Sequence, residues 1–113
     1  MDVRTKMIIR DIAEEGQYEK LRKLLIYFPK IVNEDISYDN SGKTILHHLT
    51  WLAPDDIMTK KCIKFMIQVA NADINITDNS NQTPIDMSQE CHKKTILDIL
   101  NENYTENNMN ISN

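Results

Sequence analysis

The sequence predicts an all-α protein in which three pairs of short helices are joined by projecting loops. One observation is a repeat: DNSGKTILHHL begins at Asp39, and a similar stretch, DNSNQTPIDM, begins at Asp78. A second copy is typical of structural repeats that stack on one another, whereas the loop of an enzyme's active site has no reason to occur twice. The other observation is that apolar residues recur at helical spacing around both copies, whereas no segment alternates convincingly as a β-strand does.

The first helix pair is predicted between Met7 and Phe28. Its apolar residues keep helical spacing on both sides of Gly16, which interrupts the run and separates two short helices. Pro29 ends the second helix, and the polar stretch NEDISYDNSGK that follows predicts a loop. Gly42 in this loop is free to adopt a positive φ.

The second pair begins at Thr44. Its hydroxyl can accept a hydrogen bond from a first-turn N–H, so it is expected to cap a helix that lasts to about Ala53. Asp55 and Asp56 then suit the positive end of another helix, whose apolar positions run from 57 to 70.

The third pair repeats this order. The stretch NADINITDNSNQ forms a second loop, Thr83 repeats the cap, and Pro84 takes the first helical position. Helices are expected at 85–90 and 95–100.

A length of 113 residues fits one domain with one core. We expect this domain to cover residues 1–103, with repeats at about 5–38, 39–77 and 78–103. The Asn-rich end, residues 104–113, has too few apolar residues to pack and is predicted to be disordered.

Composition narrows the classes of partner. The net charge of −4 argues against broad binding to phosphate backbones, so no nucleic-acid partner is expected. No apolar run of about 18 residues occurs, and acidic residues come too early for a secretory segment, so no membrane partner is expected either. We expect a monomer in the cytoplasm, with the nucleus as a second location, and two cysteines suit a reducing compartment.

The sequence predicts no enzyme, no metal site and no cofactor. His47 and His48 point about 100° apart on a helix and cannot share one ion. Cys62 and Cys91 lack the close spacing of a zinc site. Only two glycines occur, whereas a nucleophile with an oxyanion hole is commonly framed by a Gly-rich loop. A structural role is expected for His47, whose neutral ring can tie the helix start to neighbouring backbone.

The repeated positions resemble ankyrin repeats over about residues 7–100, nearly the whole chain. Their pattern is roughly D-x-x-G-x-T-P-L-H, with a G-A-D-V-N finger before it. The middle copy matches it at Asp39, Gly42, Thr44, Leu46 and His47, the finger at residues 71–75, and the last copy at Asp78, Thr83, Pro84 and Ile85. The resemblance implies a short solenoid of three helix–turn–helix pairs joined by β-hairpin-like fingers.

The chain departs from the family pattern in a few places. The first copy lacks the T-P-L-H entry, Ile45 replaces Pro, Asn81 replaces Gly, and Asp86 replaces His. The first and last repeats of an array are expected to be atypical because one face of each meets water. The middle copy is about six residues too long around WLAPDDIMTKK, so a bulged loop or an early second helix is expected there.

Ankyrin arrays bind other proteins through the finger tips and the exposed side of the first helices, and the resemblance implies the same surface here. Loops held on a rigid stack need little ordering on binding. The binding positions that this predicts are Tyr38, Asn40, Lys43, His48, Trp51, Ile76, Thr77, Asn79 and Gln82.

The expected function is therefore non-catalytic protein binding. In size and composition the chain looks like the short, virus-encoded ankyrin proteins similar to the inhibitor of NF-kappa-B, which implies sequestration of a Rel-type transcription factor and suppression of host immune signalling. The alternative is an adaptor that recruits a target to a larger complex such as a ubiquitin ligase. A purely structural subunit is a third option.

Overall fold

The computed structural model describes the backbone of residues 1–112 and the side chains of residues 1–103. This part of the chain is helical and contains no β-strand, which confirms the predicted all-α class. The elements are α1 (Val3–Glu14), α2 (Tyr18–Tyr27), the 3-10 helix η1 (Pro29–Asn33), α3 (Ile45–Leu52), α4 (Ile57–Gln68), α5 (Pro84–Glu90) and α6 (Lys94–Ser112).

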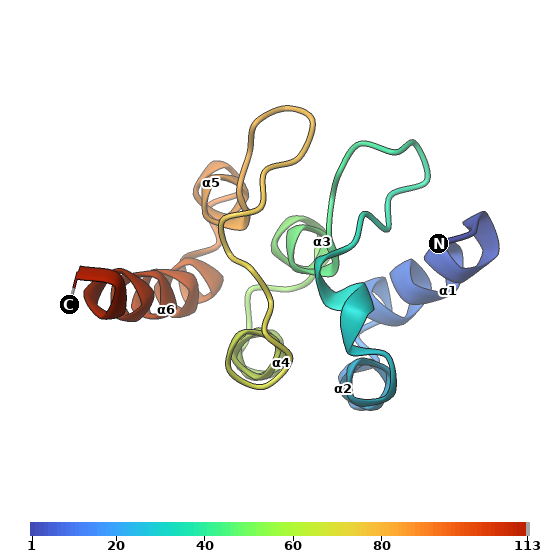
Figure 1. Cartoon of the computed structure of the whole chain (residues 1–113), viewed down its shortest axis with the longest axis horizontal. Coiled ribbons are helices and arrows are strands. Elements are labelled where there is room, and N and C mark those ends of the chain that lie inside the picture. The colour runs from blue at the N-terminus through green and yellow to red at the C-terminus, as the bar shows by residue number, and fades with distance from the viewer. Residues whose placement is uncertain (113) are drawn as a thin grey trace.

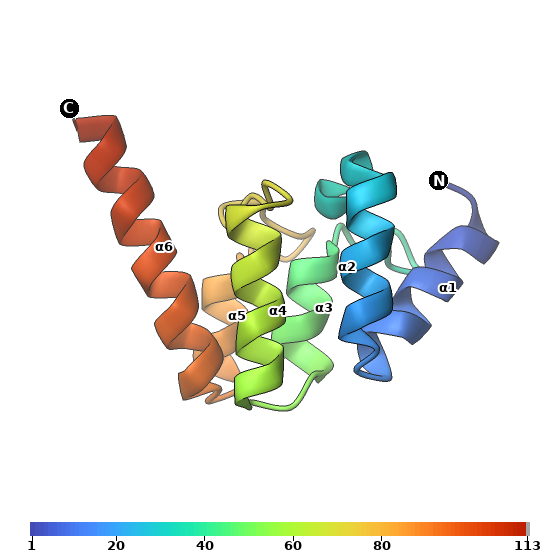
Figure 2. The ribbon, with the colours of Figure 1, turned by 90° about the horizontal axis from the view of Figure 1, so that it is seen from below.

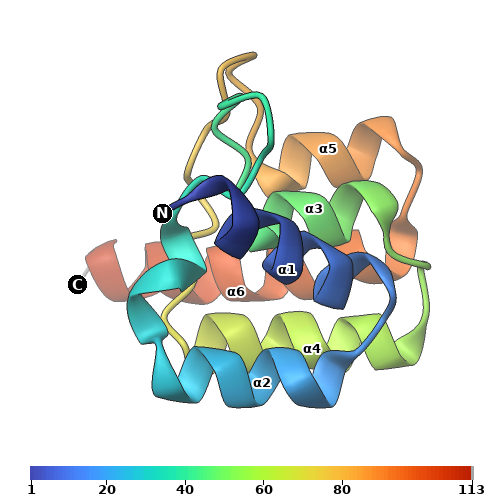
Figure 3. The same cartoon turned by 90° about the vertical axis from the view of Figure 1, so that its right-hand side faces the viewer.

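The helices form two layers. One layer contains α1, α3 and α5, and the other contains α2, α4 and α6 (Figure 3). Each helix packs against its neighbour in the same layer and against its own partner in the pair, so the three pairs stack along the 41 Å long axis with the termini at opposite ends (Figure 1).

The first pair forms for the reasons that the sequence indicates, although α1 begins earlier than predicted. The Asp2 carboxylate accepts a hydrogen bond from the Thr5 N–H at 2.7 Å and caps α1, which begins at Val3, four residues before Met7. Gly16 then adopts a φ of 72° in the turn to α2. Pro29 takes the first position of η1, and only Phe28 separates it from the end of α2.

The second and third pairs begin with equivalent caps. The side chain of Thr44 accepts from the His47 N–H and starts α3, and that of Thr83 accepts from the Asp86 N–H and starts α5. Both predicted caps are confirmed.

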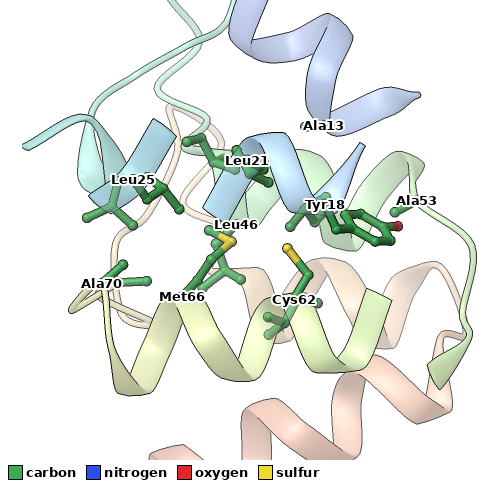
Figure 4. Close-up of a cluster of buried hydrophobic side chains, with 14 of the residues drawn as sticks. Ala13, Tyr18, Leu21, Leu25, Leu46, Ala53, Cys62, Met66 and Ala70 are labelled. Carbon is green, nitrogen blue, oxygen red and sulfur yellow. The ribbon is translucent and has the colours of Figure 1, made fainter. Parts of the chain in front are cut away.

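The core lies between the two layers (Figure 4). Leu21 and Leu25 of α2 and Cys62 and Met66 of α4 point toward Leu46 of α3, and all five side chains are almost completely buried. A buried Leu or Met side chain contributes about 1.5–3 kcal/mol relative to an exposed one. The middle pair, which packs on both neighbours, therefore holds the stack together.

The two projecting segments, residues 34–44 and 71–83, are irregular loops. The prediction of β-hairpin-like fingers is not met in the described residues, which hold no strand. Asp35 accepts hydrogen bonds from the Ser37 and Gly42 N–H groups, and Asp78 accepts from the Ser80 and Gln82 N–H groups. These carboxylates satisfy backbone donors that a strand ladder would otherwise use.

The long middle copy provides a clamp between the second and third pairs. Asp55 accepts hydrogen bonds from the Thr95 and Ile96 N–H groups at 3.1 and 2.8 Å, which caps the start of α6. In the opposite direction, the Lys93 ammonium donates to the backbone oxygens of Trp51 and Ala53 at 2.9 and 2.6 Å. The extra residues therefore secure the C-terminal pair.

The backbone of α6 continues to Ser112 and runs past the end of α4 (Figure 2). The sequence predicts that residues 104–113 are disordered. The side chains of residues 104–112 and the whole of residue 113 lie outside the described part of the chain, so this stays a prediction.

Candidate protein-binding interface

The predicted binding residues come from α3 and the two loops. Both loops project beyond the layer of first helices and lie next to each other (Figures 1 and 3). The Asn79 backbone N–H donates to the Ser41 oxygen, and its side chain donates to the Asn40 oxygen, both at 2.8 Å. A Cβ on Gly42, whose φ is 84°, would meet Asn79 Oδ1 at 2.9 Å. This Cβ would also lie 3.3 Å from Asn79 N and from Asp78 Cα, so glycine suits both the positive φ and the close approach of the loops.

Lys43 joins the loops to α3. Its ammonium lies 3.3 Å from Oδ2 of the buried Asp78, an ion pair whose geometry is not that of a hydrogen bond. The same ammonium lies 5.6 Å from the centroid of the Trp51 ring, within cation–π distance. Lys43 therefore links Trp51 to both loops.

A hollow of about 240 Å³ opens between α1 and α3, beside the first loop. We call it the His48 hollow. It is lined by Arg10, Glu14, Ser37, Tyr38, Asp39, Ser41, Lys43, His48, Trp51 and Leu52.

His48 is the buried polar group of this hollow. Its side chain is only 5% exposed, and neither Nδ1 nor Nε2 has a hydrogen-bond partner among the described residues. Burial lowers the pKa of His48 to about 4, helped by the positive charges of Arg10 and Lys43. The ring is consequently neutral at neutral pH, and the 3.8 Å between Nδ1 and the Glu14 carboxylate is no ion pair.

A neutral imidazole carries one donor and one acceptor. Leaving a buried polar group unpaired costs about 1–3 kcal/mol, so a hydrogen-bonding group that reached a ring nitrogen of His48 would recover free energy there. Both nitrogens are buried, so side chains around the hollow would have to move to admit that group. Exposed aromatic rings stand beside it: Tyr38 is 78% exposed and Trp51 is 46% exposed. The arrangement suits capture of a polar side chain with apolar and aromatic contacts around it.

A second hollow, of about 280 Å³, lies on the α5 side of Trp51 and is called the Cys91 hollow. Trp51 and Lys43 belong to both hollows and form the ridge between them. The Cys91 hollow is lined by Lys43, Trp51, Gln82, Met87, Glu90 and Cys91.

The structure brings some of the predicted residues together and separates others. Tyr38, Lys43, His48 and Trp51 surround the His48 hollow, and Gln82 joins the Cys91 hollow. Exposed Asn40 and Asn79 contact each other's loops, while Ile76 and Thr77 lie in the second loop and line neither hollow.

Sequence reasoning missed the contribution of α1. Arg10 donates to the Ile36 oxygen at 2.6 Å, and its guanidinium lies 5.9 Å from the centroid of the Tyr38 ring. Glu14, one turn later, lines the same hollow. The two residues are spaced i and i+4, which places both side chains on one face of a helix. This spacing is the sequence signal that could have indicated their shared position.

The histidine and cysteine residues that were rejected as metal ligands from the sequence have other surroundings in the structure. His47 Nδ1 accepts from the Thr44 N–H at 3.1 Å and Nε2 lies 2.9 Å from the Gln82 oxygen, which confirms its predicted structural role. Burial raises the pKa of Cys62 to about 11. Across residues 1–103, no three His, Cys, Asp or Glu side chains gather closely enough to hold a metal ion.

Comparisons of the chain with protein-family models, with curated proteins and with solved structures find no match. In the described part of the chain, no helix has the length and apolar character needed to cross a membrane.

Proposed function

We propose that the chain is a short ankyrin-type stack that binds a protein partner without catalysis. The repeated order of helix pair and loop supports the ankyrin-type assignment. So do the equivalent caps at Thr44 and Thr83 and the loop contact through Asn79. Binding through the first-helix layer and loops then follows from the family resemblance.

The observation that carries the binding function is His48, buried without a hydrogen-bond partner in a hollow bordered by exposed aromatic rings. A core histidine of purely structural use would resemble His47, whose ring nitrogens both have partners. A partner's polar side chain at His48, with Tyr38 and Trp51 as anchors, would complete the site.

The narrower proposal is sequestration of a Rel-type transcription factor in the cytoplasm or nucleus, as a mimic of the NF-kappa-B inhibitor. It is supported by the family resemblance. An adaptor would differ by holding its target and a ubiquitin-ligase component at the same time, which size-exclusion chromatography of the three proteins would reveal.

Titration calorimetry with a purified Rel-type dimer tests the proposal. Tyr38→Glu should lower affinity by about 1–3 kcal/mol if the ring is a hot spot, and it should leave folding intact because the side chain is exposed. Lys64→Gln, on the opposite layer, is the matched control and should change little. Absence of binding to the Rel-type dimer would contradict the narrower proposal. A loss of affinity from Lys64→Gln, with Tyr38→Glu silent, would show that the partner binds the layer of α2, α4 and α6 instead.

A further inference from the structure

Charge is divided unevenly over the molecule. The segment from α2 through η1 and the helix α4 together hold seven of the 13 Lys and Arg residues but one of the 17 Asp and Glu residues. Seven positive charges and one negative charge give these elements a net charge of +6, within a chain whose net charge is −4. The acidic excess therefore lies elsewhere, largely on the loops, α5 and α6.

The basic side chains point away from the core. On α2 the buried residues are Tyr18, Leu21 and Leu25, and Lys20 and Lys23 lie on the opposite side of the helix.

On α4 the buried residues include Cys62 and Met66, and Lys61 and Lys64 lie opposite them. The two helices lie side by side in one layer (Figures 2 and 3), so these four lysines share one solvent-facing surface. None of the four has an ion-pair partner among the described residues.

An apolar tip stands at one end of this surface. Ile26, Tyr27 and Phe28 are consecutive at the end of α2 and are 62%, 76% and 60% exposed. Lys23 and Lys30, both exposed, bracket them. The elements α2, η1 and α4 with these residues are called the basic surface below.

We propose that the basic surface binds an anionic lipid bilayer, with its lysines among the headgroups and the apolar tip at the acyl boundary. Clustered lysines attract an anionic leaflet, and their alkyl stems lie along apolar surface while the ammonium groups stay hydrated. Aromatic and aliphatic side chains gain free energy at the boundary of the acyl chains, without a complementary pocket.

Two properties favour a bilayer over other acidic partners. A phosphate backbone offers nothing to Ile26 and Phe28, and an acidic protein would need a pocket to hold them, since hot spots lie in well-packed pockets. The loops with Asp35, Asp39 and Asp78 project from the other layer of a molecule that measures 28 Å in that direction, and the Debye length at physiological salt is only about 8 Å. Within the same layer, the exposed acidic residues Asp98 and Glu102 lie on α6, beyond α4. Peripheral binding needs no helix that spans the membrane. It differs from the sequence-based expectation that the protein has no membrane partner.

Co-sedimentation of the full chain tests this proposal. The probes are vesicles of phosphatidylcholine alone and vesicles that also contain phosphatidylserine. Binding should require phosphatidylserine and weaken as salt is raised. Replacing Lys61 and Lys64 by Gln should lower the partition coefficient about 30-fold, since each lysine near an anionic leaflet is worth about 1 kcal/mol. The control, Arg4→Gln with Lys6→Gln on α1, removes the same charge from the other layer and should have little effect.

A second variant separates lipid from other anions. Ile26→Ser with Phe28→Ser should reduce vesicle binding, with an unchanged helical spectrum and an unchanged salt dependence. Binding of duplex DNA or polyglutamate through the same lysines, with the Ser variant indistinguishable from the parent, would overturn the proposal. Equal losses from the α1 control, or no binding to phosphatidylserine vesicles, would do so as well. Tyr38→Glu should leave vesicle binding unchanged, so this test and that of the proposed protein-binding function fail independently.

Discussion

His47 and Asp86 occupy the same position in two successive repeats of the stack. Each is the third residue of its helix and accepts a hydrogen bond from the backbone N–H of the capping threonine, at 3.1 Å for His47 and 3.0 Å for Asp86. His47 also uses its other ring nitrogen to reach the Gln82 oxygen of the next loop. Among the described residues no further loop packs against α5, and the Asp86 side chain bonds only the cap of its own helix.

His48 should make stability depend on pH between 6.5 and 4. Its pKa falls from an ordinary 6.5 to about 4 on folding, so the unfolded chain binds more protons in this window. Above pH 6.5 both states are neutral at this position; below it the free energy of unfolding should fall as pH falls, by up to about 3 kcal/mol at pH 4. Arg10, Lys43 and His47 oppose protonation, while Asp35 favours it and the Glu14 carboxylate lies nearby.

Urea denaturation across this range measures the effect. His48→Gln should remove most of the slope, and a smaller part should remain because burial also lowers the pKa of His47. His92→Asn is the control: this side chain is exposed, and Asn tolerates its φ of 56°. The explanation fails if the His48 variant keeps the full slope or if the His92 variant loses it.

At the scale of elements, the start of α6 depends on a different helix pair. Asp55 and Asp56 are adjacent, but Asp56 caps its own helix α4, whereas Asp55 caps α6 about forty residues away. The sequence indicated that acidic residues here suit a helix start, and it could not indicate which helix Asp55 would serve. That choice depends on how the second and third pairs stack.

Asp55→Ala should lower the free energy of unfolding by about 0.5–2 kcal/mol, the usual cost of losing an N-cap side chain. Hydrogen exchange should become faster at the Thr95 and Ile96 amides, which lose their acceptor. Asp98→Ala removes an exposed acidic residue within α6 itself and should leave both quantities nearly unchanged. Equal effects from the two variants would show that Asp55 contributes only its charge.

At the scale of the whole molecule, local patterns predicted local structure. Helical spacing and the threonine caps gave the helix pairs, because these features depend on residues within one turn of each other. Features that depend on stacking were not predicted: the unpaired ring of His48 requires α1 to cover it, and the basic surface requires α2 and α4 to share a layer. The composition did not indicate the basic surface, because the net charge of the whole chain is negative.

The stack itself leads to the last prediction. The middle pair contacts a neighbour on each side, and only three pairs exist in the described residues, so a defect in the middle should weaken both interfaces. Leu46 of α3 is completely enclosed, and Leu46→Ala should lower the free energy of unfolding by about 2–5 kcal/mol through lost burial and the cavity left behind.

Ile26→Ala, at an exposed position on α2, is the control and should cost no more than about 0.5 kcal/mol. Urea unfolding followed by circular dichroism would measure both variants in a protein whose native spectrum should be rich in helix. A cost below about 1 kcal/mol for Leu46→Ala would mean that the site collapses without a cavity or that the three pairs do not depend on the middle one. Unfolding of the variant in two separate steps would favour the second explanation, because a stack held through its middle pair should unfold in one cooperative transition.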